Sequence, residues 1–116
     1  MKEPVILDVV AIPALSEFQD MPQESGKPIA RTRSGEVSGM ESEGAMVGIW
    51  ECSPGIFRRQ VSKREFCHFS SGHCFFIPVG QSPIEIRAGD TVYFPADCDG
   101  VWDVRETLRK TYMIVD

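Results

Sequence analysis

Short runs of β-forming residues, interrupted every few positions by Gly, Pro, Asp or Ser, constrain the fold of this sequence more than any other feature. Runs of this length between turn-forming residues are typical of strands. We predict strands at Val5–Val10, Met46–Glu51, Phe57–Val61, Glu65–Phe69, Cys74–Ile77, Ile84–Arg87, Thr91–Pro95, Val101–Val104 and Arg109–Val115. This set, with no convincing helix, fits an all-β fold with an eight-stranded jelly roll and one added strand.

Two segments have some helical character. Pro13–Gln19 could form one helical turn, with Ser16 as a weak N-cap. Thr107–Met113 has helical propensity, but its more apolar face recurs with a period of two, at Leu108, Lys110, Tyr112 and Ile114. A period of two is the spacing of side chains on one face of a strand, so we predict a strand there.

The length of 116 residues fits a single domain with one hydrophobic core. Residues 46–116 form the predicted barrel core. Residues 1–45 belong to the same domain and comprise an N-terminal strand and a polar segment, 16–44, that wraps the barrel with one short strand near Ile29–Thr32. Alternatively, the segment 16–44 is an arm that exchanges with a second copy of the chain. We expect a homodimer.

The net charge of −5 comes without any basic run, so we expect neither nucleic acid nor a membrane as partner. No apolar stretch reaches the roughly 20 residues of a membrane span. The first ten residues do not form a signal peptide, because Asp8 interrupts their apolar run; a cytoplasmic location follows as the expectation. The four cysteines, without a C-x-x-C pair, are predicted to be reduced and buried.

Two stretches read as strand and turn units. Glu65 is followed by six residues and then Gly72, and Gly89 is followed by five residues and then Pro95. Gly89 suits a tight turn with positive φ, and Pro95 ends a strand because it has no N–H for the ladder. We predict that Gly72 allows a turn between two antiparallel strands.

These two stretches resemble the ends of the two signature motifs of the cupin superfamily. A wider resemblance covers roughly residues 48 to 114, on the segments 48–57, 65–72, 88–90, 94–96, 100–106 and 109–112. In this order and spacing they look like the small cupins grouped with the ureidoglycine aminohydrolase cupin domain and the ethanolamine-utilisation cupin. The resemblance implies a double-stranded β-helix, the cupin jelly-roll barrel, and it is specific for fold but not for activity.

The resemblance also implies where a metal would be held. Metal cupins bind their ion through three His and one Glu, and Glu65 stands at the Glu position. The positions of the three His hold other residues: Arg58 and Gln60, or Arg59 and Val61 with a shorter gap, and then Gly100. Because Arg has no lone pair to offer, we expect no metal cofactor. A divalent metal is the alternative.

Glu65 then needs a different partner. It shares a strand face with Cys67 and Phe69, and a buried carboxylate must be paired or protonated. Lys110 is one candidate, since its ammonium lies on an apolar face. Arg59 is another, but the second register would instead point Arg58 and Gln60 inward, and both registers stay open.

Three functions follow as hypotheses. The first is a barrel that binds a small polar or anionic metabolite without metal, through residues drawn from Arg58, Arg59, Gln60, Cys67 and Trp102. The second, implied by the relatives, is an enzyme on a small polar metabolite, with Glu65 as acid or base and Lys110 or Tyr112 as its partner. The third is a structural, dimeric module. The fold alone does not say whether the chain is an enzyme.

Overall fold

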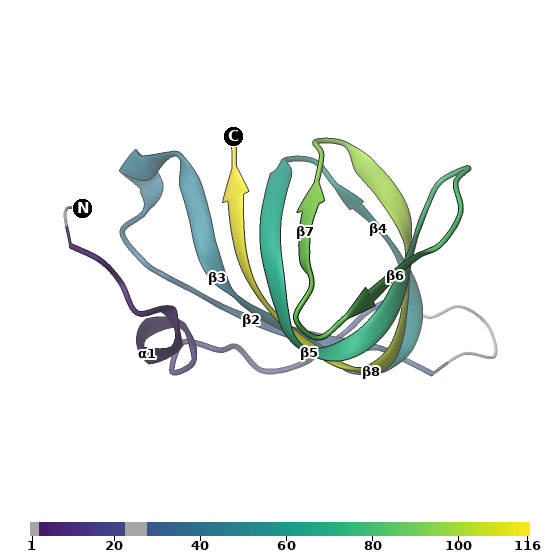
Figure 1. Cartoon of the computed structure of the whole chain (residues 1–116). Helices are drawn as coiled ribbons and strands as arrows, with labels where there is room; N and C mark the ends of the chain where they lie inside the picture. Colours follow the sequence, from purple (N-terminus) through teal and green to yellow (C-terminus); the bar gives the residue numbers. More distant parts are fainter. Residues whose placement is uncertain (1–2, 23–27) are drawn as a thin grey trace.

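The structure is a computed structural model, and it describes residues 3–22 and 28–116. Figure 1 shows a barrel of bent strands with one short helix at its side. The elements are α1 (Leu7–Ala11), β1 (Gln19–Asp20), β2 (Arg31–Glu36), the 3-10 helix η1 (Glu41–Glu43), β3 (Ala45–Cys52), β4 (Gly55–Val61), β5 (Arg64–Pro78), β6 (Ile84–Arg87), β7 (Thr91–Phe94) and β8 (Cys98–Val115).

The two long strands β5 and β8 build the barrel. They pair antiparallel along almost their whole length, with register shifts between Phe69 and Cys74. On one side of these bulges β8 pairs with β3 and β5 pairs with β7; on the other side β8 pairs with β4 and β5 pairs with β6. Each long strand therefore belongs to both layers of the barrel, and the predicted all-β jelly roll is confirmed.

Gly72 corrects one sequence prediction. It lies inside β5 and makes no turn, so the two strands predicted there are one strand. Its φ is 98°, and any side chain would collide with the backbone of Thr107 in β8. The glycine therefore allows a bulge where β5 crosses close to β8. The strands predicted at Val101–Val104 and Arg109–Val115 are likewise one strand, β8.

The first predicted strand is also wrong, because Leu7–Ala11 is helical. This helix packs beside β2 and β3, and Gly35 of β2 leaves room for the Ala11 carbonyl. The helical turn predicted at Pro13–Gln19 is also wrong, because the helix ends at Ala11, before this segment, and Gln19 already begins β1. The predicted turn at Gly89, with φ 96°, and the strand end before Pro95 are both present.

The polar segment 16–44 contributes to the main sheet. Its predicted short strand near Ile29–Thr32 corresponds to β2, which pairs along its length with β3. Within this segment, residues 23–27 lie outside the described residues. No helix in the described part of the chain is long and apolar enough to cross a membrane.

The core lies between the two layers and is unusually aromatic. Trp102 packs against the rings of Trp50, Phe69, Phe76 and Phe94, at centroid distances between 5.1 and 6.3 Å. All four cysteines are free thiols, as predicted, but Cys98 is only partly buried. Burial raises the pKa of the Cys52, Cys67 and Cys74 thiols to about 12, so these thiols stay protonated at neutral pH.

Candidate functional site

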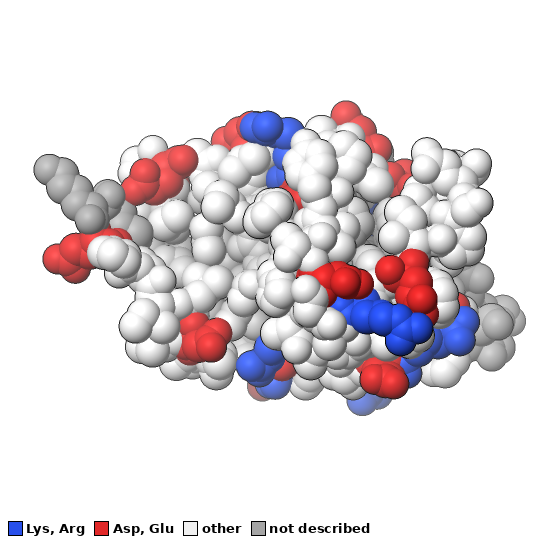
Figure 2. Space-filling model, viewed as in Figure 1, with Lys and Arg blue, Asp and Glu red and all other residues white. Residues whose placement is uncertain are grey.

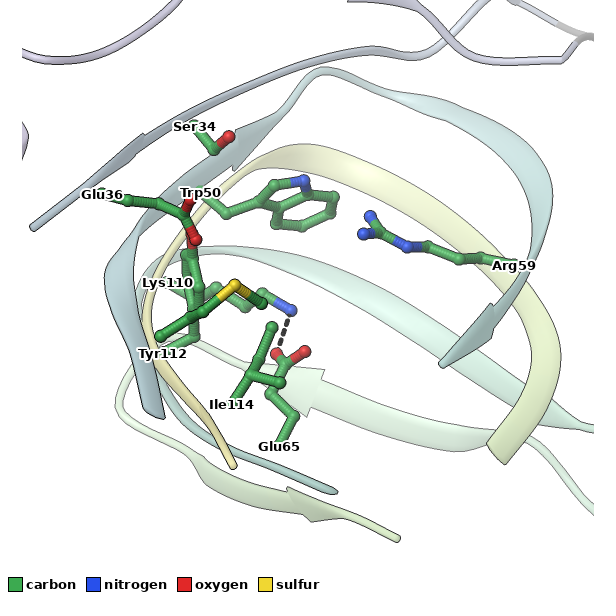
Figure 3. Close-up of a pocket in the computed structure, with 9 residues that line it drawn as sticks. Ser34, Glu36, Trp50, Arg59, Glu65, Lys110, Tyr112 and Ile114 are labelled. Carbon is green, nitrogen blue, oxygen red and sulfur yellow. Dashed lines mark hydrogen bonds and ion pairs between the residues drawn. The ribbon is translucent and has the colours of Figure 1, made fainter. Parts of the chain in front are cut away.

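A buried ion pair forms the floor of a pocket at one mouth of the barrel. Lys110 of β8 donates to Glu65 of β5 over 2.5 Å, and each side chain is only 7% exposed. The two strands are neighbours, and both residues point to the inner face (Figure 3). The pairing of Glu65 with Lys110, one of the alternatives from the sequence, is therefore present.

Aromatic rings surround the Lys110 ammonium. Its Nζ lies 4.7 Å from the ring centroid of Trp50, 5.3 Å from Trp102, 5.7 Å from Phe94 and 5.9 Å from Phe69. The negative faces of aromatic rings attract a cation at such distances. The ammonium thus has its charge balanced by Glu65 and by the rings, which is why a lysine is tolerated on an apolar face.

Arg59 of β4 reaches into the same pocket from another wall. Its guanidinium lies 6.0 Å from the ring centroid of Trp50, and Figure 3 shows it pointing toward this indole. Arg59 makes no ion pair with any residue in 3–22 or 28–116. It is a cation held at the pocket without a carboxylate of its own among those residues.

Arg58 lies outside the pocket. It forms a two-bonded ion pair with Asp99 on the other face of β4, at 2.7 and 3.2 Å. Gln60 lies on the same face as Arg58, because alternate residues of a strand share a face. The structure therefore selects the register with Arg59 and Val61 inward, and the alternative with Arg58 and Gln60 inward is wrong. The reason is Phe57, which is fully buried and sets the inner face of β4.

Tyr112 and Glu36 line the wall opposite Arg59 (Figure 3). The Tyr112 hydroxyl donates to Glu36 of β2 over 2.9 Å. Burial, together with this bond to a carboxylate, raises the pKa of Tyr112, so the phenol remains a donor. The buried tyrosine holds the more exposed Glu36 carboxylate at the pocket edge.

The pocket has a volume of about 210 Å³. Met46 and Ile114, which are register partners on β3 and β8, supply an apolar wall, and Ser34 adds a hydroxyl. A neighbouring hollow of about 420 Å³ shares Ser34, Trp50 and Arg59 with it. Both volumes are open to solvent at the barrel mouth, so a small solute can reach Arg59.

Two predicted ligand-binding residues do not line this pocket. Cys67 is buried beyond Glu65, and its thiol points to the Val92 carbonyl at 3.6 Å. Trp102 lies in the core behind Lys110 and is 2% exposed. Its Nε1 has no hydrogen-bond partner in the described ranges. Both residues shape the floor by packing and do not face the solute space.

The residues at this place do not fit a metal ion. One oxygen of Glu65 is bonded to an ammonium, and neither Lys110 nor Arg59 has a lone pair to give. Within residues 3–22 and 28–116, no three His, Cys, Asp or Glu side chains gather in a way that could hold an ion. Of the two histidines, His68 bonds Thr91 and His73 bonds Glu85, both on the outer face.

The sequence did not indicate Glu36, Ser34, Met46 or Trp50 as pocket residues. Ser34 and Glu36 lie past the end of the short strand predicted in the polar segment, so no periodicity assigned them a face. Met46 and Trp50 belong to a predicted strand with the correct alternation. Because Met46 and Trp50 are an even number of residues apart, they share one face of that strand. Their place in the pocket could be inferred from this only once the neighbouring strand was known.

A two-layer antiparallel barrel built on two long bent strands, with a polar pocket at one mouth, defines a cupin. The chain belongs to the EutQ-like cupin domain family, whose model matches residues 39–112. The matched region includes Arg59, Glu65, Lys110 and Tyr112, whereas Ser34 and Glu36 precede it.

Solved structures agree with this fold at low sequence identity. The EutQ protein of Clostridium difficile is 17% identical, with a TM-score of 0.67 over 79% of this chain and 73% of its own. An ethanolamine utilization protein Q of Salmonella typhimurium LT2 is 14% identical, with a TM-score of 0.64 over 85% and 94%. A protein of unknown function from Pseudomonas syringae pv. tomato is 17% identical, with a TM-score of 0.68 over 86% and 45%. No curated protein matches the chain.

Proposed function

We propose that this protein binds a small organic anion, such as a carboxylate, in the barrel-mouth pocket without a metal cofactor. The observation that carries the proposal is Arg59, a guanidinium without a carboxylate partner in the described residues, beside a floor whose charges are already paired. A guanidinium is suited to carboxylates because two of its N–H donors lie parallel and match the two carboxylate oxygens.

The floor supports this assignment through its electrostatics. Glu65 would repel an anion, but its charge is matched by Lys110 at 2.5 Å. The field that a solute meets in the pocket is therefore set mainly by Arg59 and by Glu36 on the far wall. An anion bound to Arg59 would also contact the indole of Trp50, which supplies apolar surface next to the cation.

The test is a calorimetric titration of the purified protein with acetate, propionate, butyrate and inorganic phosphate at low salt. We expect at least one carboxylate to bind at millimolar or lower concentration, and Arg59→Gln to weaken it by about tenfold or more. Arg58→Gln is the matched control, because Arg58 lies on the same strand but faces Asp99. Equal losses in both variants, or no binding to the unchanged protein, would contradict the proposal.

A location in the cytoplasm is part of the same proposal. Its support is the four free cysteines, three of them buried, since free thiols are usual where the compartment is reducing.

The enzyme alternative, with Glu65 as acid or base, requires that carboxylate to leave its bond with Lys110. Glu65→Gln is the variant that tests it once a turnover assay exists.

We also propose that the chain pairs with a second copy through the outer face of its larger layer, the one that contains β3, β8, β5 and β7. Val47, Met113, Phe66 and Tyr93 are register partners in one row across β3, β8, β5 and β7. Three of them are exposed, and Leu7 of α1 borders a shallow apolar hollow over the row. Figure 2 shows an uncharged area over these strands between charged rims.

A second copy is the occupant that the charges favour. A chain with a net charge of −5 can pair with itself only where like charges do not meet, and this row contains no charged side chain. Sedimentation at micromolar concentration should show a dimer, and Phe66→Glu should convert it to a monomer. Ile84→Glu, an exposed apolar residue outside the row, is the control. A monomer in the unchanged protein would reject the pairing.

A further inference from the structure

The pocket carries two opposite charges on facing walls. Arg59 comes from β4 and Glu36 from β2, and in Figure 3 they approach from opposite sides with Trp50 between them. Neither forms an ion pair with the other or with any further residue in 3–22 and 28–116. Both charges are therefore available to a solute in the space between them.

Glu36 is held in place for this role by Tyr112. The tyrosine is 8% exposed and donates to one carboxylate oxygen of Glu36, Oε2. The other oxygen receives no side-chain hydrogen bond within the described part of the chain. A carboxylate with one oxygen fixed and one left over is an acceptor for an ammonium group of a ligand.

Apolar side chains form part of the wall between the two charges. Met46 and Ile114 lie on one side, and the Trp50 indole lies next to Arg59. A volume of about 210 Å³ is smaller than the roughly 300–1,000 Å³ of sites for drug-sized ligands. The space therefore suits a short aliphatic linker that carries a charge at each end.

From this arrangement we infer that the ligand is a small zwitterion, an amino acid in which a short carbon chain separates the carboxylate from the ammonium group. The carboxylate pairs with Arg59, and the ammonium group pairs with Glu36. The inference rests on the proposed anion site and adds a second recognition element to it. The buried Lys110 and Glu65 form the floor, and they pair with each other and not with the ligand.

A matched set of ligands tests the inference. Glycine, β-alanine and 4-aminobutyrate are titrated beside acetate, propionate and butyrate, which lack only the amino group, and beside butylamine, which lacks the carboxylate. We expect at least one amino acid to bind about tenfold more tightly than its matched carboxylate. Glu36→Gln should remove this advantage while leaving the binding of the carboxylate unchanged or tighter. Arg59→Gln should weaken both ligands.

The outcomes separate the two proposals. If carboxylates bind through Arg59 but the amino group adds nothing at any chain length, the zwitterion inference is wrong and the anion site stands. If no carboxylate and no amino acid binds at millimolar concentration, the anion site itself fails. If butylamine binds best and Arg59→Gln has no effect, both are overturned. Thermal unfolding of each variant checks that loss of binding does not come from loss of fold.

Discussion

Lys110 keeps its ammonium in the barrel interior because the protein supplies both an opposite charge and several aromatic faces for it. Removing a charge from water is costly, and the attraction to a single partner commonly offsets only part of that cost. Here the Glu65 carboxylate and four aromatic rings lie close to the Nζ atom. The charge pair occupies the volume at the barrel floor and leaves Arg59 as the cation that a solute can reach.

Replacement of Lys110 by Met should destabilise the protein strongly. The variant leaves Glu65 buried without a partner, for which a loss of about 3–5 kcal/mol in the free energy of unfolding is expected. Adding Glu65→Leu to Lys110→Met should recover much of this loss, because no charge then remains buried. Urea unfolding measures both variants. Lys63→Met is the control, since its partner Asp116 lies at the surface. A single variant no worse than the double would contradict this account.

The sequence permitted part of the site to be predicted, and the reason lies in side-chain parity. Glu65 and Lys110 each lie on the inner face of a predicted strand, so their pairing could be proposed from the period of two. The choice between Arg58 and Arg59 needed the burial of Phe57, because the two registers differ by one residue. Glu36 could not be found, because its strand lies in a polar segment without clear periodicity and because Tyr112, which bonds its carboxylate, lies far away in the sequence.

At the scale of elements, Glu51 ties three strands together on the outer face. It lies on β3 and accepts from Arg33 of β2 at 2.5 Å and from Arg109 of β8 at 2.8 Å. Burial raises the pKa of Glu51, but the bonds from the two arginines outweigh it and hold the pKa below its ordinary value of 4.5. The carboxylate therefore binds fewer protons in the folded state than in the unfolded state.

This shift predicts a pH dependence of stability. A lowered pKa contributes stability that is present above pH 4.5 and is lost as the pH falls through the folded-state pKa. Glu51→Gln should lower the free energy of unfolding at neutral pH by about 2 kcal/mol. It should also flatten the loss of stability below pH 4.5. Chemical unfolding at a series of pH values measures both, with the exposed Glu106→Gln as control. If the stability of Glu51→Gln falls with acid as steeply as that of the unchanged protein, the proposed role of Glu51 is contradicted.

The strand pattern was predicted better than the strand lengths. The sequence indicated the turn at Gly89 because the turn has a local signature, a glycine with positive φ and a hydrogen bond from the Asp90 amide to the Arg87 carbonyl. Gly72 was misread as a turn, since a glycine that permits a turn and one that permits close approach to another strand have the same local signature. The helix at Leu7–Ala11 was misread because Val9 and Val10 favour strands, whereas the helix packs beside β2 and β3.

At the scale of the whole molecule, the barrel separates its two proposed surfaces. The pocket opens on the inner face of the larger layer, and the uncharged row lies on its outer face, since neighbouring residues of a strand point to opposite sides. Pairing through the row would thus leave the pocket open to solvent. TM-scores of 0.64–0.68 to three solved structures show a fold shared over most of the chain, although the sequence identities are only 14–17%. The chemistry of this member must come from its own pocket residues.

The most direct test of the anion site is an NMR titration of the arginine Nε–H signals of the nitrogen-15-labelled protein with butyrate. The Arg59 signal, identified by its absence in Arg59→Gln, should shift and reach saturation. The Arg58 signal should stay in place, because that side chain is held by Asp99 on the opposite face. If the Arg59 signal does not move, or if both signals move together without saturation, Arg59 is not the anchor of an anion site.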